Sequence, residues 1–270
     1  MRKSAIAGVA AGALIAVGAA APALAVEDGM TELSVFHGIP DTPVDVYVNG
    51  TNTIDDFQPG DLAGPLDLEP GTYTVALTAT DAADDSDPVL GPIDITLEEG
   101  MSYTAVAHLT AEGDPGVNLF TNDISETAAG EGRLTVRHTA AAPAVDVWAD
   151  GAVLFENLSN PDEVSGDVPA ATYEAAVSLT GETDPVLGPT DVEIADGVNT
   201  IVYAWGSAAD GNLDLAVQTV DTHSSSPSEV AAGTQGLAAD RGVPAGAIAA
   251  ILLAFALAAA AAGRMVTARR

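Results

Sequence analysis

Two aspartates recur in the same short phrase, 101 positions apart. Asp45 lies in "PVDVYVNG" (43–50) and Asp146 lies in "PAVDVWADG" (143–151). Two carboxylates can act as acid and base on a glycosidic bond when they lie roughly 5–10 Å apart. These two belong to separate copies of one segment. We therefore expect each carboxylate to accept hydrogen bonds at the surface of its own sheet, from a backbone amide or a hydroxyl.

The four histidines, at 37, 108, 138 and 223, are also candidates for proton transfer. Nucleophilic catalysis needs a Ser, Thr or Cys beside a base that a third group orients. The chain has no Cys and no G-x-S-x-G motif. His37 and His138 occupy equivalent places on the core-facing side of a strand, which favours structural, hydrogen-bonded side chains. The sequence therefore predicts no catalytic residue and no enzyme.

The acidic stretch "DAADDSD" (81–87) could offer several oxygen ligands to calcium. It lacks the spacing of an EF-hand loop, and its counterpart is only "GETD" (181–184). Zinc prefers clustered His or Cys, which are absent. We expect a solvated acidic loop, no metal site and no cofactor, with a calcium site at Asp81–Asp87 as the alternative.

Aromatic residues also recur, as the pairs Tyr47/Trp148 and Tyr73/Tyr173. Such side chains can stack on a sugar or a peptide. With aromatics at 4% of the chain, packing within the sheets is the preferred interpretation.

The charge is strongly one-sided. All 39 acidic residues lie between Glu27 and Asp240. That interval holds only two basic residues, Arg133 and Arg137, so its net charge is −37. Such a field repels nucleic acid, and the basic footprint of a nucleic-acid-binding protein is missing. It favours solubility and the accumulation of cations, and adaptation to high salt is one explanation.

An internal repeat organises the region between the two ends. "DPVLGPIDITLEEG" (87–100) matches "DPVLGPTDVEIADG" (184–197), with six identical residues in a row, and "GTYTVALTAT" (71–80) matches "ATYEAAVSLT" (171–180). Repetition at this length indicates duplicated domains. We place them at 31–125 and 132–221, joined by the linker "SETAAGEG" (125–132).

Alternating apolar and polar residues in both copies predict short strands. In "VDVYV", the valines face one way while Asp45 and Tyr47 face the other, which is typical of a half-buried strand. Asn49-Gly50 and Asp150-Gly151 favour type I′ hairpin turns. Seven or eight strands per copy predict an all-β protein of two tandem antiparallel β-sandwiches, immunoglobulin-like or transthyretin-like.

Both ends of the chain suggest export and anchoring. Residues 1–25 read as a signal peptide with Arg2 and Lys3 at its start and "ALA" (23–25) at its cleavage site. Residues 222–242 read as a flexible stalk, 243–263 as an uncharged transmembrane helix and 264–270 as a basic cytoplasmic tail. The expected location is the cell membrane, with a single span and an extracellular ectodomain.

One family shares several of these features. An opening strand that ends at His37, the segment from Pro43 to Gly50, "PGTY" (70–73) and "GMSYTAVA" (100–107) resemble the DUF4397 domain of exported bacterial proteins, often found in tandem. The second copy departs from it at Ala170-Ala171 and at Trp148. The resemblance implies a surface location and this fold, and it brings no activity with it. The composition looks actinobacterial.

These features predict a non-catalytic, membrane-tethered module at the bacterial cell surface, structural or adhesive and ligand-binding. Expected partners are the membrane and a cell-wall glycan or a surface protein, with no nucleic acid. Two alternatives stay open: a cell-envelope hydrolase that uses surface carboxylates, and a calcium-dependent adhesion module.

Overall fold

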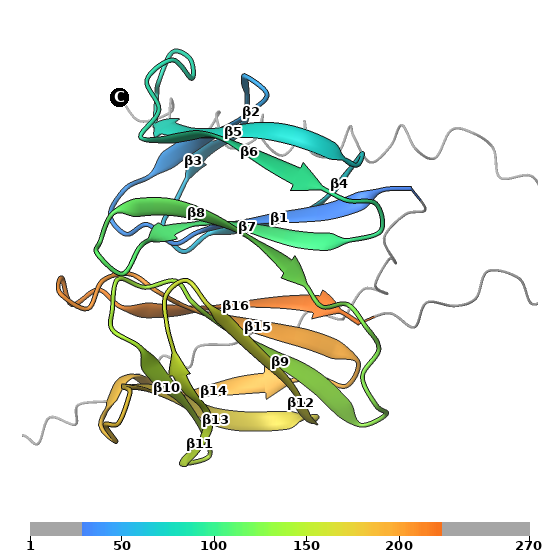
Figure 1. Ribbon diagram of the computed structural model, residues 1–270, viewed down its shortest axis with the longest axis vertical. Helices are drawn as coiled ribbons and strands as arrows, with labels where there is room; N and C mark the ends of the chain where they lie inside the picture. Colours follow the sequence, from blue (N-terminus) through green and yellow to red (C-terminus); the bar gives the residue numbers. More distant parts are fainter. Residues whose placement is uncertain (1–28, 223–270) are drawn as a thin grey trace, which may run out of the picture. The chain divides into compact units, whose positions relative to one another are not determined.

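A computed structural model describes residues 29–222 as sixteen β-strands (Figure 1). The first eight are β1 Thr31–His37, β2 Val44–Val48, β3 Thr51–Phe57, β4 Leu62–Leu68, β5 Gly71–Ala79, β6 Leu90–Leu97, β7 Ser102–Leu109 and β8 Pro115–Asn122. The second eight are β9 Glu131–His138, β10 Val145–Ala149, β11 Ala152–Leu158, β12 Glu163–Pro169, β13 Ala171–Leu179, β14 Pro185–Ile194, β15 Val198–Trp205 and β16 Asp214–Asp221. This part of the chain is all-β.

The strands form four sheets of four strands, two in each copy. The first copy has the sheets β4-β1-β7-β8 and β3-β2-β5-β6, and the second repeats them as β12-β9-β15-β16 and β11-β10-β13-β14. Each pair of sheets encloses an apolar core, so the copies form two β-sandwich-like domains. Val44, Val46 and Leu77 lie in the first core, and Val145, Val147 and Val177 lie in the second.

The expectation of wholly antiparallel sheets is wrong at one pair in each copy. β1 pairs with β7 in parallel, and β9 pairs with β15 in the same way. Five strands separate the partners, and such a long connection lets the chain return in the same direction. Alternation of apolar and polar residues predicts which side chains share one face of a strand. It does not predict which other strand lies beside that strand.

The hairpin turns have the predicted geometry. Asn49 and Gly50 have φ of 50° and 77°, and Asp150 and Gly151 have φ of 49° and 75°. Val48 pairs with Thr51 across the turn, as Ala149 pairs with Ala152, so each loop contains two residues. Both central residues of a type I′ turn need positive φ, which confirms the prediction.

The repeated "DPVLGP" phrase has a backbone explanation. Gly91 and Gly188 have φ of 98° and 81°, and a Cβ at either would lie 2.7 or 2.6 Å from a carbonyl oxygen of the neighbouring strand. Both lie where the pairing of β5 with β6, or β13 with β14, shifts register. Only glycine tolerates that approach, so the phrase recurs because each copy has the same bulge.

The two sandwiches pack on each other through their inner sheets. Figure 1 shows the sheet of β1, β7 and β8 lying against the sheet of β9, β15 and β16, with the other two sheets outside them. A separate apolar cluster fills this contact, and it takes Phe36, Val106 and Phe120 from the first copy and Ile201, Tyr203 and Trp205 from the second. The internal repeat predicts two domains in tandem, but it does not indicate this buried interface.

Residues 29–222 contain no helix long and apolar enough to cross a membrane. The predicted signal peptide, transmembrane helix and tail lie outside the described residues, as does nearly all of the predicted stalk.

Candidate functional site

The recurring aspartates bind backbone amides. Oδ1 of Asp45 accepts from the N–H of Asp56 at 2.9 Å, and Oδ1 of Asp146 accepts from the N–H of Asn157 at 2.8 Å. Asp56 and Asn157 have positive φ, at 52° and 56°. The carboxylate thus holds a bulge in the strand paired with its own. This explains why Asp recurs in both hairpins.

Asp146 has a second backbone donor, the N–H of Gly181 at 2.9 Å. Hydrogen bonds from Asn157 and then Gly181 lower the pKa of Asp146, because they stabilise the carboxylate. Asp45 is 1% exposed and Asp146 is 7% exposed. The expectation of a half-buried strand is therefore wrong here. The loop after β5 lies on the outer face, where Tyr47 donates to the carbonyl of Ala82 at 3.4 Å.

The equivalent histidines close the loop that follows their strand. Nε2 of His37 lies 2.7 Å from the carbonyl of Thr42, and Nε2 of His138 lies 3.0 Å from the carbonyl of Pro143. A carbonyl can only accept, so Nε2 carries the proton in both rings. Both rings are almost wholly buried, and burial lowers the pKa of each. They are neutral, structural side chains.

The other residues singled out from the sequence also have local partners. His108 contacts the carbonyl of Leu109 through Nδ1 at 2.8 Å and Oδ1 of Asn118 through Nε2 at 2.9 Å. Trp148 donates to the hydroxyl of Ser178 at 2.9 Å. The hydroxyls of Tyr73 and Tyr173 donate to the carbonyls of Glu69 and Pro169 at 2.7 and 2.8 Å.

The acidic loop Asp81–Asp87 is mostly exposed. Asp84 accepts from the N–H of Ser86 at 3.0 Å, and hydrogen bonds from Ser86 lower the pKa of Asp84. Nowhere in 29–222 do three or more His, Cys, Asp or Glu side chains gather as a metal would require.

Both arginines of residues 29–222 serve the contact between the sandwiches. Arg137 on β9 is wholly buried. Its guanidinium lies 4.5 Å from the ring centre of Phe120 on β8 and donates to Oδ1 of Asn122 at 3.0 Å. It also donates to the hydroxyl of Tyr203 at 2.8 Å and to Oε2 of Glu163 at 2.8 Å. One side chain therefore binds residues of both copies.

Polar groups around Arg137 complete a cluster across the interface. The hydroxyl of Tyr203 donates to Oε1 of Gln218 at 2.6 Å. Oγ1 of Thr104 on β7 lies 3.1 Å from both Gln218 Oε1 and Asn122 Oδ1. Burial raises the pKa of Tyr203. Because these groups satisfy one another, the polar cluster can be buried without leaving Arg137 unpaired.

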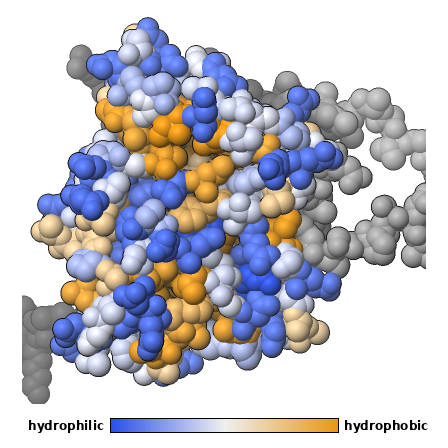
Figure 2. Space-filling model, viewed as in Figure 1, coloured by the Kyte–Doolittle hydropathy of each residue, from blue (hydrophilic) through white to orange (hydrophobic). Residues whose placement is uncertain are grey.

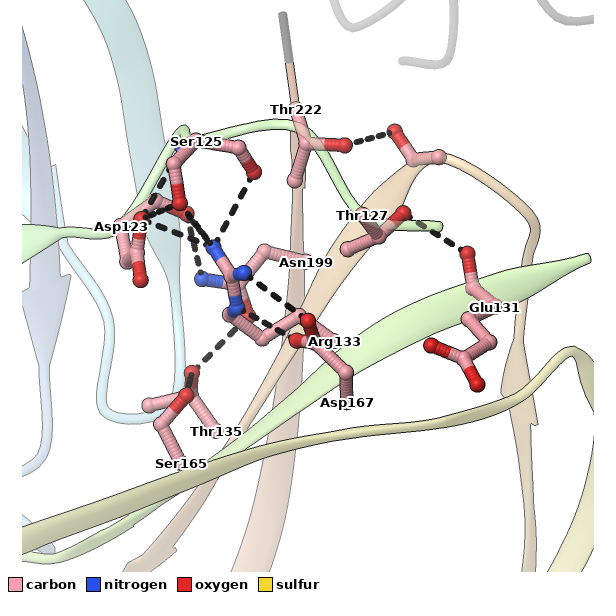
Figure 3. Close-up of polar contacts among 11 residues, drawn as sticks. Asp123, Ser125, Thr127, Glu131, Arg133, Thr135, Ser165, Asp167, Asn199 and Thr222 are labelled. Carbon is pink, nitrogen blue, oxygen red and sulfur yellow. Dashed lines mark hydrogen bonds and ion pairs between the residues drawn. The ribbon is translucent and has the colours of Figure 1, made fainter. Parts of the chain in front are cut away.

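Arg133 ties the linker to the second copy (Figure 3). It forms two hydrogen bonds to the carboxylate of Asp167, at 2.8 and 3.2 Å, and an ion pair with Asp123 at 2.7 Å. It also donates to the carbonyl and hydroxyl of Ser125, at 3.1 and 3.0 Å. Burial opposes ionisation of Asp123, but hydrogen bonds from Ser125 and the charge of Arg133 together lower its pKa. The linker is thus held at its start.

A further bridge lies at the other end of the interface. The side-chain amide of Asn160 donates to the carbonyl of Leu109 in the first copy and to that of Ala140 in the second, at 2.8 and 2.6 Å. The two copies are therefore linked at several separate points, and their inner sheets have little freedom to shift.

A cleft of about 600 Å³ opens where loops of both copies meet. It is lined by Pro40, Asp41, Pro43, Gln58 and Pro59 from the first copy and by Trp205, Asn212, Leu213 and Asp214 from the second. The amide of Asn212 lies 3.4 Å from Oδ2 of Asp41 across it. Prolines and a tryptophan offer apolar surface, and the carboxylates and amides offer hydrogen bonds. Ligand sites commonly combine these features at domain interfaces.

Sequence reasoning did not find this cleft. Asp41 and Pro43 match the family motif, but nothing in the sequence marks them as part of a cleft, because the cleft exists only when two copies dock. One signal was present: the outward positions of β9 are Arg133, Thr135 and Arg137, which include the only two basic residues between Glu27 and Asp240. Two arginines on one strand face of an otherwise acidic chain indicate a specific partner surface.

Comparison with curated proteins gives no match. The model of the family described as "Domain of unknown function (DUF4397)" matches residues 31–148. The match covers the whole first sandwich, the linker, β9 and most of β10, so it ends inside the second sandwich. The chain thus contains a DUF4397 domain, as its sequence motifs predicted.

Proposed function

We propose that the chain is a non-catalytic, membrane-tethered module of the cell surface that binds a ligand in the cleft between its two sandwiches. The observation that carries the proposal is the cleft itself, which takes its walls from both copies. The surrounding contacts at Arg137, Arg133 and Asn160 support it, because they hold the two walls in one geometry. A fixed site loses little conformational freedom when a ligand binds.

The contacts of the candidate groups support the non-catalytic part of the proposal. Asp45 and Asp146 bind backbone amides, and His37 and His138 bind carbonyls with their rings buried. A general acid or base needs to reach the reacting group. An extracellular location on a single span is the environment that the predicted signal peptide and the apolar segment 243–263 support.

The test is a screen of residues 26–222 on arrays of cell-wall glycans and peptides, with a matched pair of variants. Leu213→Trp puts bulk into the cleft, whereas Leu154→Trp adds the same bulk on β11 of an outer sheet. We expect wild type and Leu154→Trp to bind the same spots and Leu213→Trp to lose them.

The arrays are also examined for turnover. A spot that is consumed by wild type but not by Asp45→Asn or Asp146→Asn would overturn the non-catalytic proposal in favour of a hydrolase. Equal binding by wild type, Leu154→Trp and Leu213→Trp would show that the ligand does not bind in the cleft.

A further inference from the structure

A second hollow has a lining that adjoins that of the cleft in the sequence. This groove, of about 220 Å³, mixes apolar and polar surface and is lined by Phe36, Gly60, Leu62, Tyr203, Leu215, Ala216, Val217 and Gln218. On both walls it begins one residue after the cleft ends: Gly60 follows Pro59, and Leu215 follows Asp214. We call the cleft and the groove together the seam.

Two free strand edges border the seam. β4 and β16 are each the last strand of their sheet, so each pairs on one side only. Leu62 on β4 is 41% exposed and Val217 on β16 is 53% exposed, and both line the groove. Exposed apolar residues elsewhere lie in separate clusters among hydrophilic ones, as on the face drawn in Figure 2. An extended chain that alternates apolar and polar side chains fits such an edge.

Charge decides what kind of chain would bind. Residues 29–222 hold 35 acidic side chains and two basic ones, a net charge of −33, and both arginines are buried. The cleft contributes the carboxylates of Asp41 and Asp214, and both residues are exposed. A second copy of this chain or an anionic polymer would be repelled, whereas a cationic segment would be attracted.

The inner wall of the cleft also has a donor without a partner. Trp205 is 8% exposed, and its indole Nε1 is buried with no hydrogen-bond acceptor among residues 29–222. The Cζ2 edge of the ring, which adjoins Nε1, lies against Gly60, which lines the groove. A buried donor left unpaired costs stability, so the ring of Trp205 lies at the cleft with one polar atom unsatisfied.

We infer that the seam binds an extended, cationic peptide segment, with basic side chains at Asp41 and Asp214 and an apolar side chain between Leu62 and Val217. This rests on the proposed function and names its ligand class. Backbone carbonyls of the peptide supply acceptors, and the free edge of β16 supplies a template for an added strand.

The experiment uses the full chain in a nonionic detergent and a labelled eight-residue peptide of alternating Lys and Val. Binding is measured by fluorescence anisotropy at fixed ionic strength, with the alternating Glu and Val peptide as the anionic comparison. We expect saturable binding of the Lys peptide only. The double variant Asp41→Asn/Asp214→Asn should weaken it roughly tenfold.

A second double variant with the same net charge tests for non-specific electrostatic attraction. Asp184→Asn/Asp191→Asn lowers the negative charge by the same amount on or beside β14, in an outer sheet. It should leave the affinity within about twofold. Val217→Thr should weaken binding, whereas Val186→Thr, at another exposed valine, should not. Equal losses in both double variants would overturn the inference.

A second readout follows Trp205 directly. In a Trp148→Phe background Trp205 is the only tryptophan of the chain. The Lys peptide should shift the emission of Trp205, and an unchanged spectrum at saturation would contradict the placement in the seam.

A neutral N-acetylglucosamine tetramer separates this inference from the proposed function. If the tetramer binds, if Leu213→Trp abolishes that binding and if the Lys peptide does not bind, the peptide inference is overturned while the proposed function stands. If no ligand is sensitive to Leu213→Trp, the proposed function fails as well.

Discussion

Asp146 accepts hydrogen bonds from the N–H groups of Asn157 and Gly181. It therefore joins β10 to the bulge of β11 and to the turn after β13. Those bonds lower the pKa of Asp146 below that of an unfolded aspartate, which is about 3.9. The stabilisation is therefore complete above that unfolded pKa, and it is lost as the pH falls through the lower pKa of the folded state.

Asp146→Asn should make this visible. The amide keeps an oxygen for one N–H group but has no charge, so the variant should melt at a lower temperature than wild type at pH 7. As the pH falls from 5 to 3 the difference should shrink, because only wild type loses a charged acceptor. Melting followed by circular dichroism measures it. A gap that stays constant over this range would show that the carboxylate charge does not hold the bulge.

At this scale the sequence predicted that Asp45, Asp146, His37 and His138 are placed equivalently in the two copies. It could not identify the backbone groups that they bind. Asp45 and Asp56 are close only because β3 contains a bulge, and a bulge depends on the pairing of two strands. The role of Arg137 could not be predicted for the same reason, since its partners come from three other strands, β8, β12 and β15.

Glycines at the turns and bulges fix the elements, and two of them separate conformational strain from close packing. Gly151 has φ of 75° and a Cβ there would meet nothing within 4 Å, whereas a Cβ at Gly188 would lie 2.6 Å from the carbonyl of Ala175. An alanine at either position must adopt a left-handed conformation. Only at Gly188 must the neighbouring strand also move.

Gly151→Ala should therefore lower the free energy of unfolding by about 1 kcal/mol. Gly188→Ala should lower it by about 3 kcal/mol, because a steric clash with backbone is added. Urea unfolding of the two variants and of wild type measures both. Equal losses would mean that the close approach at Gly188 is relieved without cost.

Element prediction followed the strength of the local signal. Strands with regular alternation, such as β2 and β10, and their two-residue turns were predicted. β3 and β4 were not predicted from the sequence: "TNTIDDF" and "LAGPLDL" carry acidic residues, Gly and Pro, which disfavour strands in general. Both are edge strands, where such residues are tolerated.

For the molecule as a whole, the candidate site depends on the two sandwiches forming one unit. The aromatic rings of Phe36 and Tyr203 stack with their centres 4.5 Å apart, and Arg137 lies in the polar cluster beside them. The cleft and the groove have walls from both copies, so they exist only in the docked arrangement. Domain duplication was evident from the repeat, but docking needs the outward faces of β1 and β9, whose residues differ between the copies.

Calorimetric unfolding of residues 26–222 tests this claim most directly. We expect a single transition for wild type, because unfolding either sandwich would expose the apolar cluster at the interface and leave Arg137 without Asn122 or Tyr203. Arg137→Ala should destabilise that transition by about 3 kcal/mol, through lost packing and unpaired polar groups. Two independent transitions in wild type, with only one of them shifted by Arg137→Ala, would contradict a docked pair and with it the cleft.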